Sequence, residues 1–398
     1  MKACWLSLAG AVVLVGCGAS DNGSPGGSAG AGTGGATAGS GGAGPTGGGG
    51  QSQAGSAGSA GSGVGGGSGG GGAGAGGAGG GGSGGAAAVG FECPAGASEA
   101  PILTGLAPTR VMGVPPADAF NNDNNDFSNI EGDVWIGDAL YVSEISATTG
   151  QQGQPPPARV LKITADDQVS ILLPDSGSNG LATNAAGELL GAIHKDGSIS
   201  KLSLSGGAAV PVVSMFMGMR FDSPNDLTIH PNGTIYFTDP NWQDPNPVPQ
   251  TATRAYRVPP GGQPESIEAD GVLNQPNGIT LSKNHDFLYI GGNQLKKYPV
   301  MPDGSLGAGT SFVDGGKGDG MVLDCGDNLY VASGSDPTFT VYSAAGAVLG
   351  KVTVTGLSQV TNLAFGGADH KTLYVSGQGG KDQKGLFKIP MNVAGFPY

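Results

Sequence analysis

Residues 220–239 read RFDSPNDLTIHPNGTIYFTD, and this stretch contains the unit that repeats along the chain. Its second half holds two runs of β-branched and aromatic residues, DLTIH and TIYFT, joined by the turn sequence PNG at 231–233, which is the pattern of a β-hairpin. Its first half places Arg220, Asn225 and Asp226 just before a strand with the composition of a buried one. Polar groups near a core cost free energy unless something binds them, so the stretch also predicts a bound partner.

The same unit recurs weakly after Gly90. Each copy opens on a polar residue, continues with a short apolar strand and a turn containing Gly, Asp or Asn, and ends in a second strand that resembles x-L-Y-V. The second strands carry landmark residues that are 49, 46, 53, 41 and 44 positions apart, namely Tyr141, Leu190, Tyr236, Tyr289, Tyr330 and Tyr374. A period of about 40–50 residues made of short strands is typical of propeller blades with four strands each.

Six such units in about 300 residues predict an all-β fold, a six-bladed β-propeller. Helical repeats of this length are excluded, because the apolar residues alternate instead of recurring every three or four positions. The last unit ends after GLFKIPM, one strand short of a full blade. We expect an early segment near Thr109–Val114 to supply the missing strand and close the ring.

The residue that opens each unit carries a side-chain oxygen in all six copies. These residues stand 10 to 12 positions before their landmarks and are Glu131, Asn179, Asn225, Asn277, Asp319 and Asn362. In equivalent blades they would precede the innermost strands and ring one mouth of the central channel. Carboxylate and amide oxygens suit a hard divalent cation, so we expect Ca²⁺, with Mg²⁺, Mn²⁺ or Zn²⁺ as alternatives. A competing interpretation is that the Asn-Gly and Asp-Gly pairs only form turns.

The start of the chain has the pattern of an export signal. Residues 1–17, MKACWLSLAGAVVLVGC, join a Lys at position 2 to an apolar stretch that is too short to span a bilayer. The sequence LVGC at 14–17 resembles a bacterial lipobox, which predicts cleavage before Cys17 and a lipid on Cys17. The alternative is plain cleavage by another peptidase. We expect an exported bacterial lipoprotein, anchored in a membrane through Cys17 on the periplasmic or cell-surface face.

The residues that follow divide into a linker and a globular domain. Residues 18–90 are nearly all Gly, Ala and Ser and cannot offset the chain entropy lost on folding, which predicts a disordered linker. About 70 residues of this composition have an r.m.s. span of roughly 45–50 Å. Residues 91–398 have the composition of a domain that buries one sizeable core.

Cysteine and charge content limit the partners of this domain. Cys93 and Cys325 remain after processing, and export favours a disulfide between them over two free thiols. The formal net charge is −13 and no basic cluster is present, which argues against nucleic-acid binding and is compatible with a cation site. We expect a monomer that acts on a small molecule.

Several of the repeat units resemble a known family. The stretches EGDVW from Glu131, RFDSPNDLTIHPNGTIYFTDP from Arg220, QPNGITLSKNHDFLYIGG from Gln275 and GDGMVLDCGDNLYVAS from Gly318 are similar to the senescence marker protein/gluconolactonase family, which includes regucalcin. The resemblance covers the chain from Ala119 to its C-terminus. It implies a six-bladed propeller with a divalent metal in its central channel that hydrolyses sugar lactones and related cyclic esters.

The resemblance also implies roles for single residues around the metal. Glu131, Asn277 and Asp319 match the family's three protein metal ligands, and Asn225 matches the asparagine that faces both metal and substrate. A cation with an open coordination site would polarise the lactone carbonyl and lower the pKa of a bound water. Asp319 is the candidate general base, with Glu131 as the other carboxylate beside the ion.

The expected substrate contacts are less specific. Arg220 resembles the arginine that contacts the substrate's hydroxyls or ring, and Asp226 and Asn179 belong to the same polar group. His194, at the end of LLGAIH, is a candidate proton shuttle at the channel mouth, or else a polar residue at a strand end. The family often continues FTDP with Pro-Tyr-Gly, whereas this chain has NWQDPNPVPQ at 241–250, a loop that we expect to shape the pocket mouth.

Two functions remain open at this point. The first is a metal-dependent lactonase, and the second is a non-catalytic, calcium-stabilised propeller that binds a protein or glycan at the cell surface, because a fold alone does not separate the two. A serine hydrolase is excluded, since Gly-x-Ser-x-Gly strings occur only in the linker, where composition alone produces them.

Overall fold

The coordinates are a computed structural model, which describes residues 91–94, 97, 99–111, 129–146, 155–243, 249–378 and 385–396. The predicted signal, Cys17 and the predicted linker lie outside these residues. All described residues fall within one unit, Gly80–Tyr398. They form 26 β-strands, and among them there is no helix. A helix that could cross the lipid bilayer is therefore also absent from the described ranges.

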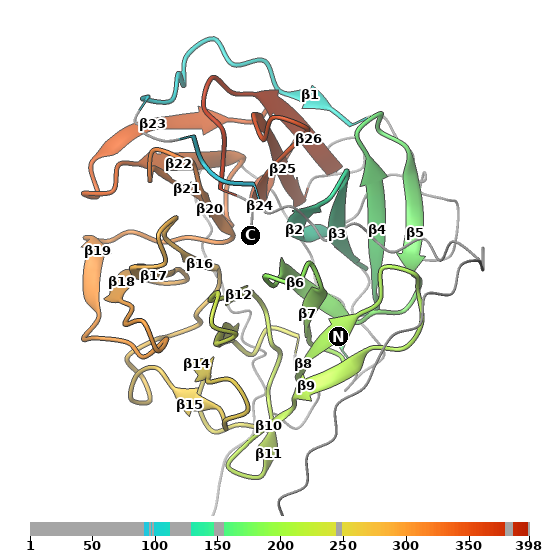
Figure 1. The fold of residues 1–398 in the computed structure, drawn as a ribbon, viewed down its shortest axis with the longest axis vertical. Coiled ribbons are helices and arrows are strands. Elements are labelled where there is room, and N and C mark those ends of the chain that lie inside the picture. The colour runs from blue at the N-terminus through green and yellow to red at the C-terminus, as the bar shows by residue number, and fades with distance from the viewer. Residues whose placement is uncertain are drawn as a thin grey trace, which may run out of the picture. The chain divides into compact units, whose positions relative to one another are not determined.

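The strands build six four-stranded antiparallel sheets around a central axis, which confirms the predicted six-bladed propeller (Figure 1). In the first three blades the strands, from the axis outward, are β2 (Asn129–Ile136), β3 (Ala139–Ile145), β4 (Ala158–Thr164) and β5 (Val169–Leu173); β6 (Ser178–Thr183), β7 (Leu189–Ile193), β8 (Ser198–Leu202) and β9 (Val210–Val213); and β12 (Leu227–Ile229), β13 (Ile235–Asp239), β14 (Arg254–Val258) and β15 (Glu265–Ser266). A two-stranded hairpin between the second and third blades consists of β10 (Met215–Phe216) and β11 (Met219–Arg220).

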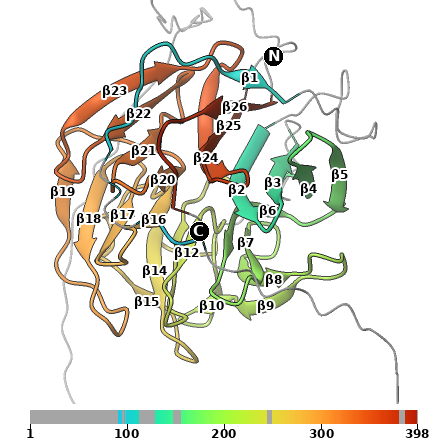
Figure 2. The ribbon, with the colours of Figure 1, turned by 45° about the horizontal axis from the view of Figure 1, so that its top comes forward.

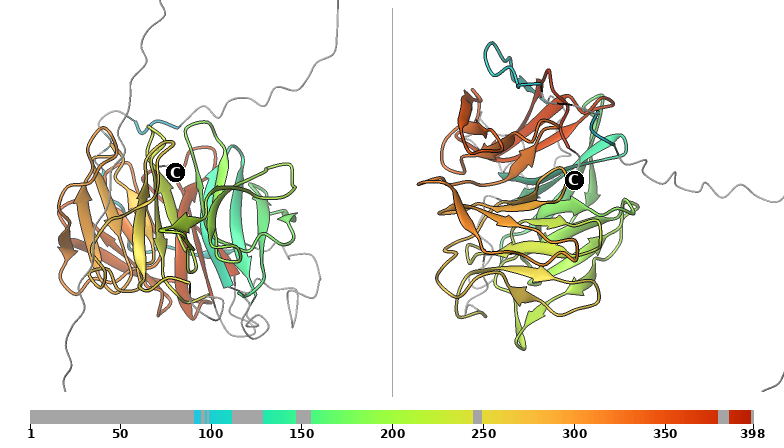
Figure 3. Two further views of the ribbon diagram at one scale, coloured as in Figure 1. Left: turned by 90° about the horizontal axis from the view of Figure 1, so that it is seen from below. Right: turned by 60° about the vertical axis from the view of Figure 1, so that its left-hand side comes forward.

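The other three blades follow the same order. Their strands are β16 (Ile279–Leu281), β17 (Phe287–Ile290), β18 (Leu295–Pro299) and β19 (Thr310–Val313); β20 (Met321–Leu323), β21 (Leu329–Ala332), β22 (Thr338–Tyr342) and β23 (Val348–Thr353); and β24 (Gln359–Gly366), β25 (Thr372–Gln378), β26 (Gly385–Pro390) and β1 (Thr109–Arg110). Seen edge-on, the strands run roughly along the axis of the ring (Figure 3).

The ring is closed by the early strand, as the sequence predicts. Thr109 and Arg110 of β1 pair with Lys388 and Phe387 of β26. The Val111 N–H extends this pairing by donating to the Leu386 carbonyl at 2.8 Å. Figure 2 shows β1 beside β26, at the outer edge of the sixth blade. Residues 112–114 of the expected closing segment lie outside the described residues.

The core lies between neighbouring blades. Side chains alternate across a strand, so each sheet presents one apolar face to the blade before it and one to the blade after it. Trp135 of the first blade stacks on Tyr374 of the sixth, with ring centroids 5.7 Å apart, and Tyr330 of the fifth blade meets Phe365 of the sixth. The repeated tyrosines of the second strands are therefore core residues that join blades.

The glycines that follow four of the opening polar residues have a packing role. A Cβ atom at Gly278 would lie 2.0 Å from the carbonyl oxygen of Asp319, and a Cβ atom at Gly132 would lie 2.2 Å from that of Asn179. The glycine after Asn179 approaches the Asn225 carbonyl oxygen in the same way, and the glycine after Asp319 approaches the Asn362 side chain. Because only glycine permits so close an approach, these pairs do more than form turns. They bring the starts of the innermost strands together around the axis.

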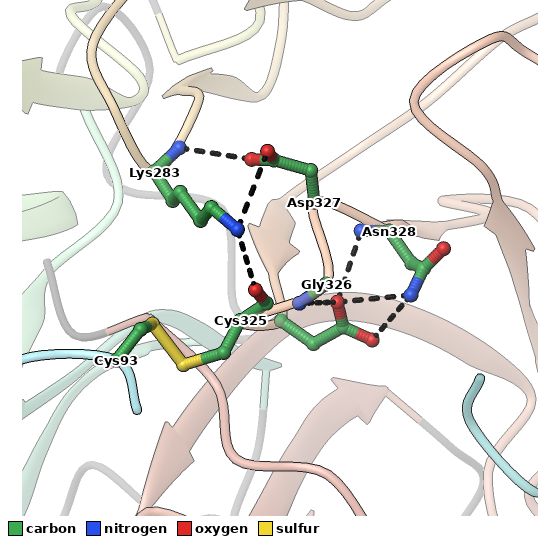
Figure 4. The surroundings of a disulfide bond; sticks show 7 residues. Cys93, Lys283, Cys325, Gly326, Asp327 and Asn328 are labelled. Atoms are coloured by element: carbon green, nitrogen blue, oxygen red, sulfur yellow. Dashed lines mark hydrogen bonds and ion pairs between the residues drawn. A yellow bond between two sulfur atoms is a disulfide. The ribbon is translucent and has the colours of Figure 1, made fainter. Parts of the chain in front are cut away.

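The opposite end of the channel is closed by both ends of the described chain. The C-terminal residues reach the centre of the ring in Figure 1, where the Phe396 N–H donates to the Leu323 carbonyl at 2.9 Å. Cys93 and Cys325 form a disulfide at this end (Figure 4). The Lys283 ammonium donates to the Cys325 carbonyl at 2.7 Å and holds the same turn.

Candidate functional site

A polar cavity of about 240 Å³ lies at the other end of the channel, where the innermost strands begin. We call it the mouth cavity. Five of the six predicted oxygen-bearing residues line it, namely Glu131, Asn179, Asn225, Asn277 and Asp319. They come from five different blades and are brought together by the close approach of the innermost strands. The repeat therefore predicts the convergence of residues that are far apart in the sequence.

The sixth residue, Asn362, does not reach the mouth cavity. Strand β24 has an irregularity between Val360 and Asn362, and such a bulge shifts the alternation of side chains by one residue. Thr361 donates to the Ile130 carbonyl of the first blade at 2.5 Å, while the Asn362 side chain accepts the N–H of its own successor at 2.7 Å. Gln359 lines the mouth cavity from β24 instead.

Of the two carboxylates of the mouth cavity, Asp319 is buried and Glu131 is partly buried. Burial raises the pKa of Asp319 to about 8, and the nearby charge of Asp226 adds to this effect. Burial also raises the pKa of Glu131 well above its ordinary value, with further contributions from Asp319 and other acidic neighbours. Among the described residues, no Lys, Arg or His forms an ion pair with either carboxylate. A cation would remove this electrostatic cost.

The donor atoms of the mouth cavity fit a hard divalent cation. The side-chain oxygens of Asn277 and Asn129 are buried and have no hydrogen-bond partner, and both residues line the cavity beside Glu131 and Asp319. No group of three or more His, Cys, Asp or Glu side chains in the described ranges is arranged to hold a metal. An ion at the mouth would therefore need the amide oxygens as well as the carboxylates, a donor set that suits Ca²⁺.

Arg220 is not among the residues that line the mouth cavity. Its guanidinium donates to the main-chain carbonyls of Phe221 at 3.0 Å, His194 at 3.1 Å and Asp222 at 3.2 Å. The residue lies on β11, in the hairpin outside the four-stranded blades, and these carbonyls satisfy its donors there. Arg220 therefore lies outside the lining of the mouth cavity, and its contact with a substrate stays a prediction.

His194 is also away from the mouth cavity. It is fully buried and its Nε2 atom lies 2.8 Å from the Pro156 carbonyl. Burial lowers the pKa of His194 to about 4, so the ring is neutral near pH 7. This geometry favours the alternative interpretation of His194, a hydrogen-bonded polar residue at a strand end, over a proton shuttle.

Asp226 lies deeper in the channel than its neighbour Asn225. Its carboxylate accepts the Leu227 N–H at 2.9 Å and the Ile279 N–H at 3.1 Å, which joins the third and fourth blades. Burial raises its pKa to about 7. Asp226 therefore faces the interior of the channel below the mouth. Asn225 and Asp226 are neighbours in the sequence but line different cavities.

The loop that departs from the family pattern does contribute to the mouth cavity. Trp242 and Gln243 line it, and the Asn179 amide donates to the Gln243 side-chain oxygen at 3.3 Å. The Trp242 ring remains about half exposed, at 49%. Residues 244–248 of this loop lie outside the described residues.

Asn129 also lines the mouth cavity and is absent from the residues predicted from the sequence. It stands two positions before Glu131 on β2, and the period of two in a strand puts both on the channel face. That alternation was the available signal. Gln359 carries no comparable signal, because the bulge that sets its orientation depends on contacts with another blade.

These features define a class, the β-propellers with an oxygen-lined central channel. The family model described as "SMP-30/Gluconolactonase/LRE-like region" matches residues 130–378, and the chain belongs to this family.

Curated relatives have lactonase names. A gluconolactonase of Zymomonas mobilis is 29% identical over 284 residues, which cover 62% of this chain and 75% of the relative. A pentonolactonase of Haloferax volcanii is 26% identical over 170 residues, which cover 40% of this chain and 55% of the relative. These similarities support a lactonase-like enzyme of the hydrolase class.

Solved structures agree with this family assignment. A gluconolactonase of Xanthomonas campestris superposes with a TM-score of 0.56 at 25% identity, covering 74% of this chain and 98% of that one. A calcium-binding regucalcin of Agrobacterium tumefaciens superposes with a TM-score of 0.55 at 19% identity, covering 72% and 96%, and shows likeness of fold.

Proposed function

We propose that the protein is a divalent-cation-dependent hydrolase of a sugar lactone or a related cyclic ester, with the reaction in the mouth cavity. One observation carries the proposal. Glu131 and Asp319 converge in a polar cavity of about 240 Å³ without a described cationic partner, next to amide oxygens that lack hydrogen bonds. Removing a carboxylate from water is costly unless a cation compensates it, so this donor set favours a bound ion.

The residues at the mouth would have different roles in the reaction. Glu131, Asn277 and Asp319 would hold the cation, with Asn225 at the side of the substrate. When bound, the ion supplies Lewis-acid polarisation of the ester carbonyl and acidifies water. Asp319 is the carboxylate beside the ion that would accept a proton from the attacking water. The water oxygen adds to the carbonyl carbon, and the ring ester bond then breaks to give a hydroxy acid.

The rim of the mouth cavity favours a polyhydroxylated substrate. Asn179 and Gln243 offer amide donors and acceptors at the rim, and Trp242 presents a half-exposed ring beside them. Amide groups can hydrogen-bond hydroxyls, while an aromatic face packs against the apolar face of a sugar ring.

The compartment is part of the same proposal. We propose an exported lipoprotein that is anchored through Cys17. The disulfide between Cys93 and Cys325 supports this location, because such bonds persist in oxidising compartments. Mass spectrometry of the membrane-extracted protein tests it, and an unmodified Cys17 within an uncleaved N-terminus would reject it.

The enzymatic proposal is tested with the purified full-length protein and gluconolactone in a pH-indicator assay. We expect acid release that chelation abolishes and Ca²⁺ restores, and that Glu131→Gln reduces strongly. The matched control is Asp314→Asn, an exposed carboxylate after β19, which should keep full activity. Turnover that ignores both the chelator and Glu131→Gln would reject the proposal. A chelator-sensitive melting temperature without turnover of any lactone would favour the calcium-stabilised binding propeller.

A further inference from the structure

A second, smaller cavity of about 40 Å³ lies below the mouth cavity, among the middle parts of the innermost strands. We call it the inner cavity. Asp133 of β2, Asp226 before β12 and Thr228 of β12 line it, and Phe396 of the C-terminal segment is also part of its wall. It is separate from the mouth cavity, since the residues that line one do not line the other.

Asp133 is the unusual residue of this cavity. Its side chain is only 8% exposed, and neither carboxylate oxygen has a hydrogen-bond partner. A buried carboxylate without a partner must either bind a proton or bind a cation.

The surroundings of Asp133 favour a cation over a proton. Asp226 brings a second carboxylate to the cavity, and two main-chain N–H groups that donate to it hold it in place. The Thr228 hydroxyl is buried and also lacks a partner, so a third oxygen is free to bind. The innermost strand of each blade is a sheet edge, and its unpaired main-chain groups face the channel.

We propose that the inner cavity is a second cation site, in which Asp133, Asp226 and Thr228 bind one Ca²⁺ ion along the propeller axis. The volume limits the occupant, because a water molecule takes roughly 30 Å³ in the liquid and a cavity of this size holds one ion with little of its hydration shell. Mg²⁺, which keeps several waters, is therefore less suitable than Ca²⁺. The ion joins the first and third blades across the channel. The proposal does not depend on lactonase activity.

The test counts ions in the full-length protein. After removal of metals and dialysis against Ca²⁺, elemental analysis should find two Ca²⁺ ions per chain in the wild type. Asp133→Asn, which keeps the shape of the side chain, should bind one, and Glu131→Gln should lose the mouth ion but keep the inner one. The control is Asp138→Asn, an exposed aspartate in the turn after β2, which should bind two. An Asp133→Asn protein that binds as many ions as the wild type would overturn the inner site.

A second measurement covers the case in which Asp133→Asn fails to express. Thr228→Val removes only the hydroxyl oxygen, and isothermal titration should show one of the two Ca²⁺ affinities weakened about 10-fold, the other unchanged. Equal affinities in Thr228→Val and wild type would reject the site. A wild-type protein with a single ion that Glu131→Gln removes would also reject it while leaving the lactonase proposal intact. If the wild-type protein binds two Ca²⁺ ions but hydrolyses no lactone, the lactonase proposal is rejected and the inner site is retained.

Discussion

The two ends of the central channel each hold a buried aspartate, but the two aspartates differ in their hydrogen bonding. Strand β20 runs between them, with Asp319 two residues before its first residue and Asp324 directly after its last. Both aspartates are buried. Asp324 accepts hydrogen bonds from the N–H groups of Gly326 and Asn328, from the Asn328 amide and from the Tyr330 hydroxyl. Asp319 accepts hydrogen bonds from the N–H of its successor, at 3.1 Å, and from the Asn277 side chain.

The difference shows how this propeller separates stability from binding. At the closed end, hydrogen bonds and a disulfide occupy the polar groups (Figure 4). At the mouth, side-chain oxygens of Asn129 and Asn277 remain without partners in a buried setting. Unpaired buried groups destabilise a fold, so two amide oxygens without partners beside two carboxylates indicate that the mouth is arranged for a ligand.

The largest expected effect comes from exchanging the two aspartates for asparagine one at a time. Asp319→Asn should lower kcat/KM for lactone hydrolysis by roughly 10²–10⁴-fold, the size of a general-base contribution, with little loss of stability. Asp324→Asn should keep kcat/KM but lower the free energy of unfolding by about 1–3 kcal/mol, because it weakens several buried hydrogen bonds. Lactonase assays and urea unfolding on both variants measure this contrast. The reverse pattern would remove the distinction between the two ends.

The next effect concerns the disulfide at the closed end. Replacing Cys93 and Cys325 together by serine should lower the free energy of unfolding by about 2–5 kcal/mol, because the bond limits the unfolded chain. The bond spans 232 residues of sequence. Ca²⁺ affinity and kcat should stay at wild-type values, since the cysteines are at the far end from the mouth. A variant that loses Ca²⁺ binding in proportion to its stability would show that the two ends are coupled.

A smaller effect tests how the blades meet at the mouth. Gly278→Ala should cost about 1–3 kcal/mol and weaken Ca²⁺ binding, because the new methyl would collide with the Asp319 main chain. Gly137→Ala is the control: its site is open, but its φ of 64° disfavours a side chain, so it should cost about 1 kcal/mol through backbone strain alone. Its Ca²⁺ affinity, measured by isothermal titration, should not change. Equal affinities in the two variants would argue against the packing role of Gly278.

The last prediction is a slope in the pH dependence of stability, expressed per pH unit. Without Ca²⁺, the raised pKa of Asp319 means that the folded state binds more protons than the unfolded state between about pH 4 and pH 8. The free energy of unfolding should therefore fall as pH rises through this window, by at most about 1.4 kcal/mol per pH unit for each such carboxyl. Saturating Ca²⁺ should reduce the fall, because the cation replaces the proton. Melting temperatures with and without chelator measure it, with Asp319→Asn as the variant in which the slope is smaller.

Much of the fold was predictable from particular residues. The spacing of the landmark tyrosines predicts six blades, and the short last unit predicts that Thr109 and Arg110 complete it, as they do. Residues at equivalent positions of a repeat point to equivalent places, so five of the six opening oxygens meet at the mouth. The predicted lipid anchor and linker stay predictions, because they lie outside the described residues.

The sequence by itself determined the repeat, the ring and the oxygen-rich character of the channel, because local alternation and turn chemistry repeat wherever the residues repeat. Only the tertiary structure decided which oxygens face which cavity. A bulge in β24 turns Asn362 away from the mouth, main-chain carbonyls from other segments hold Arg220 and His194 outside the site, and Asp133 and Asp226 meet in an inner cavity. These outcomes depend on contacts between blades, which no spacing within one blade contains.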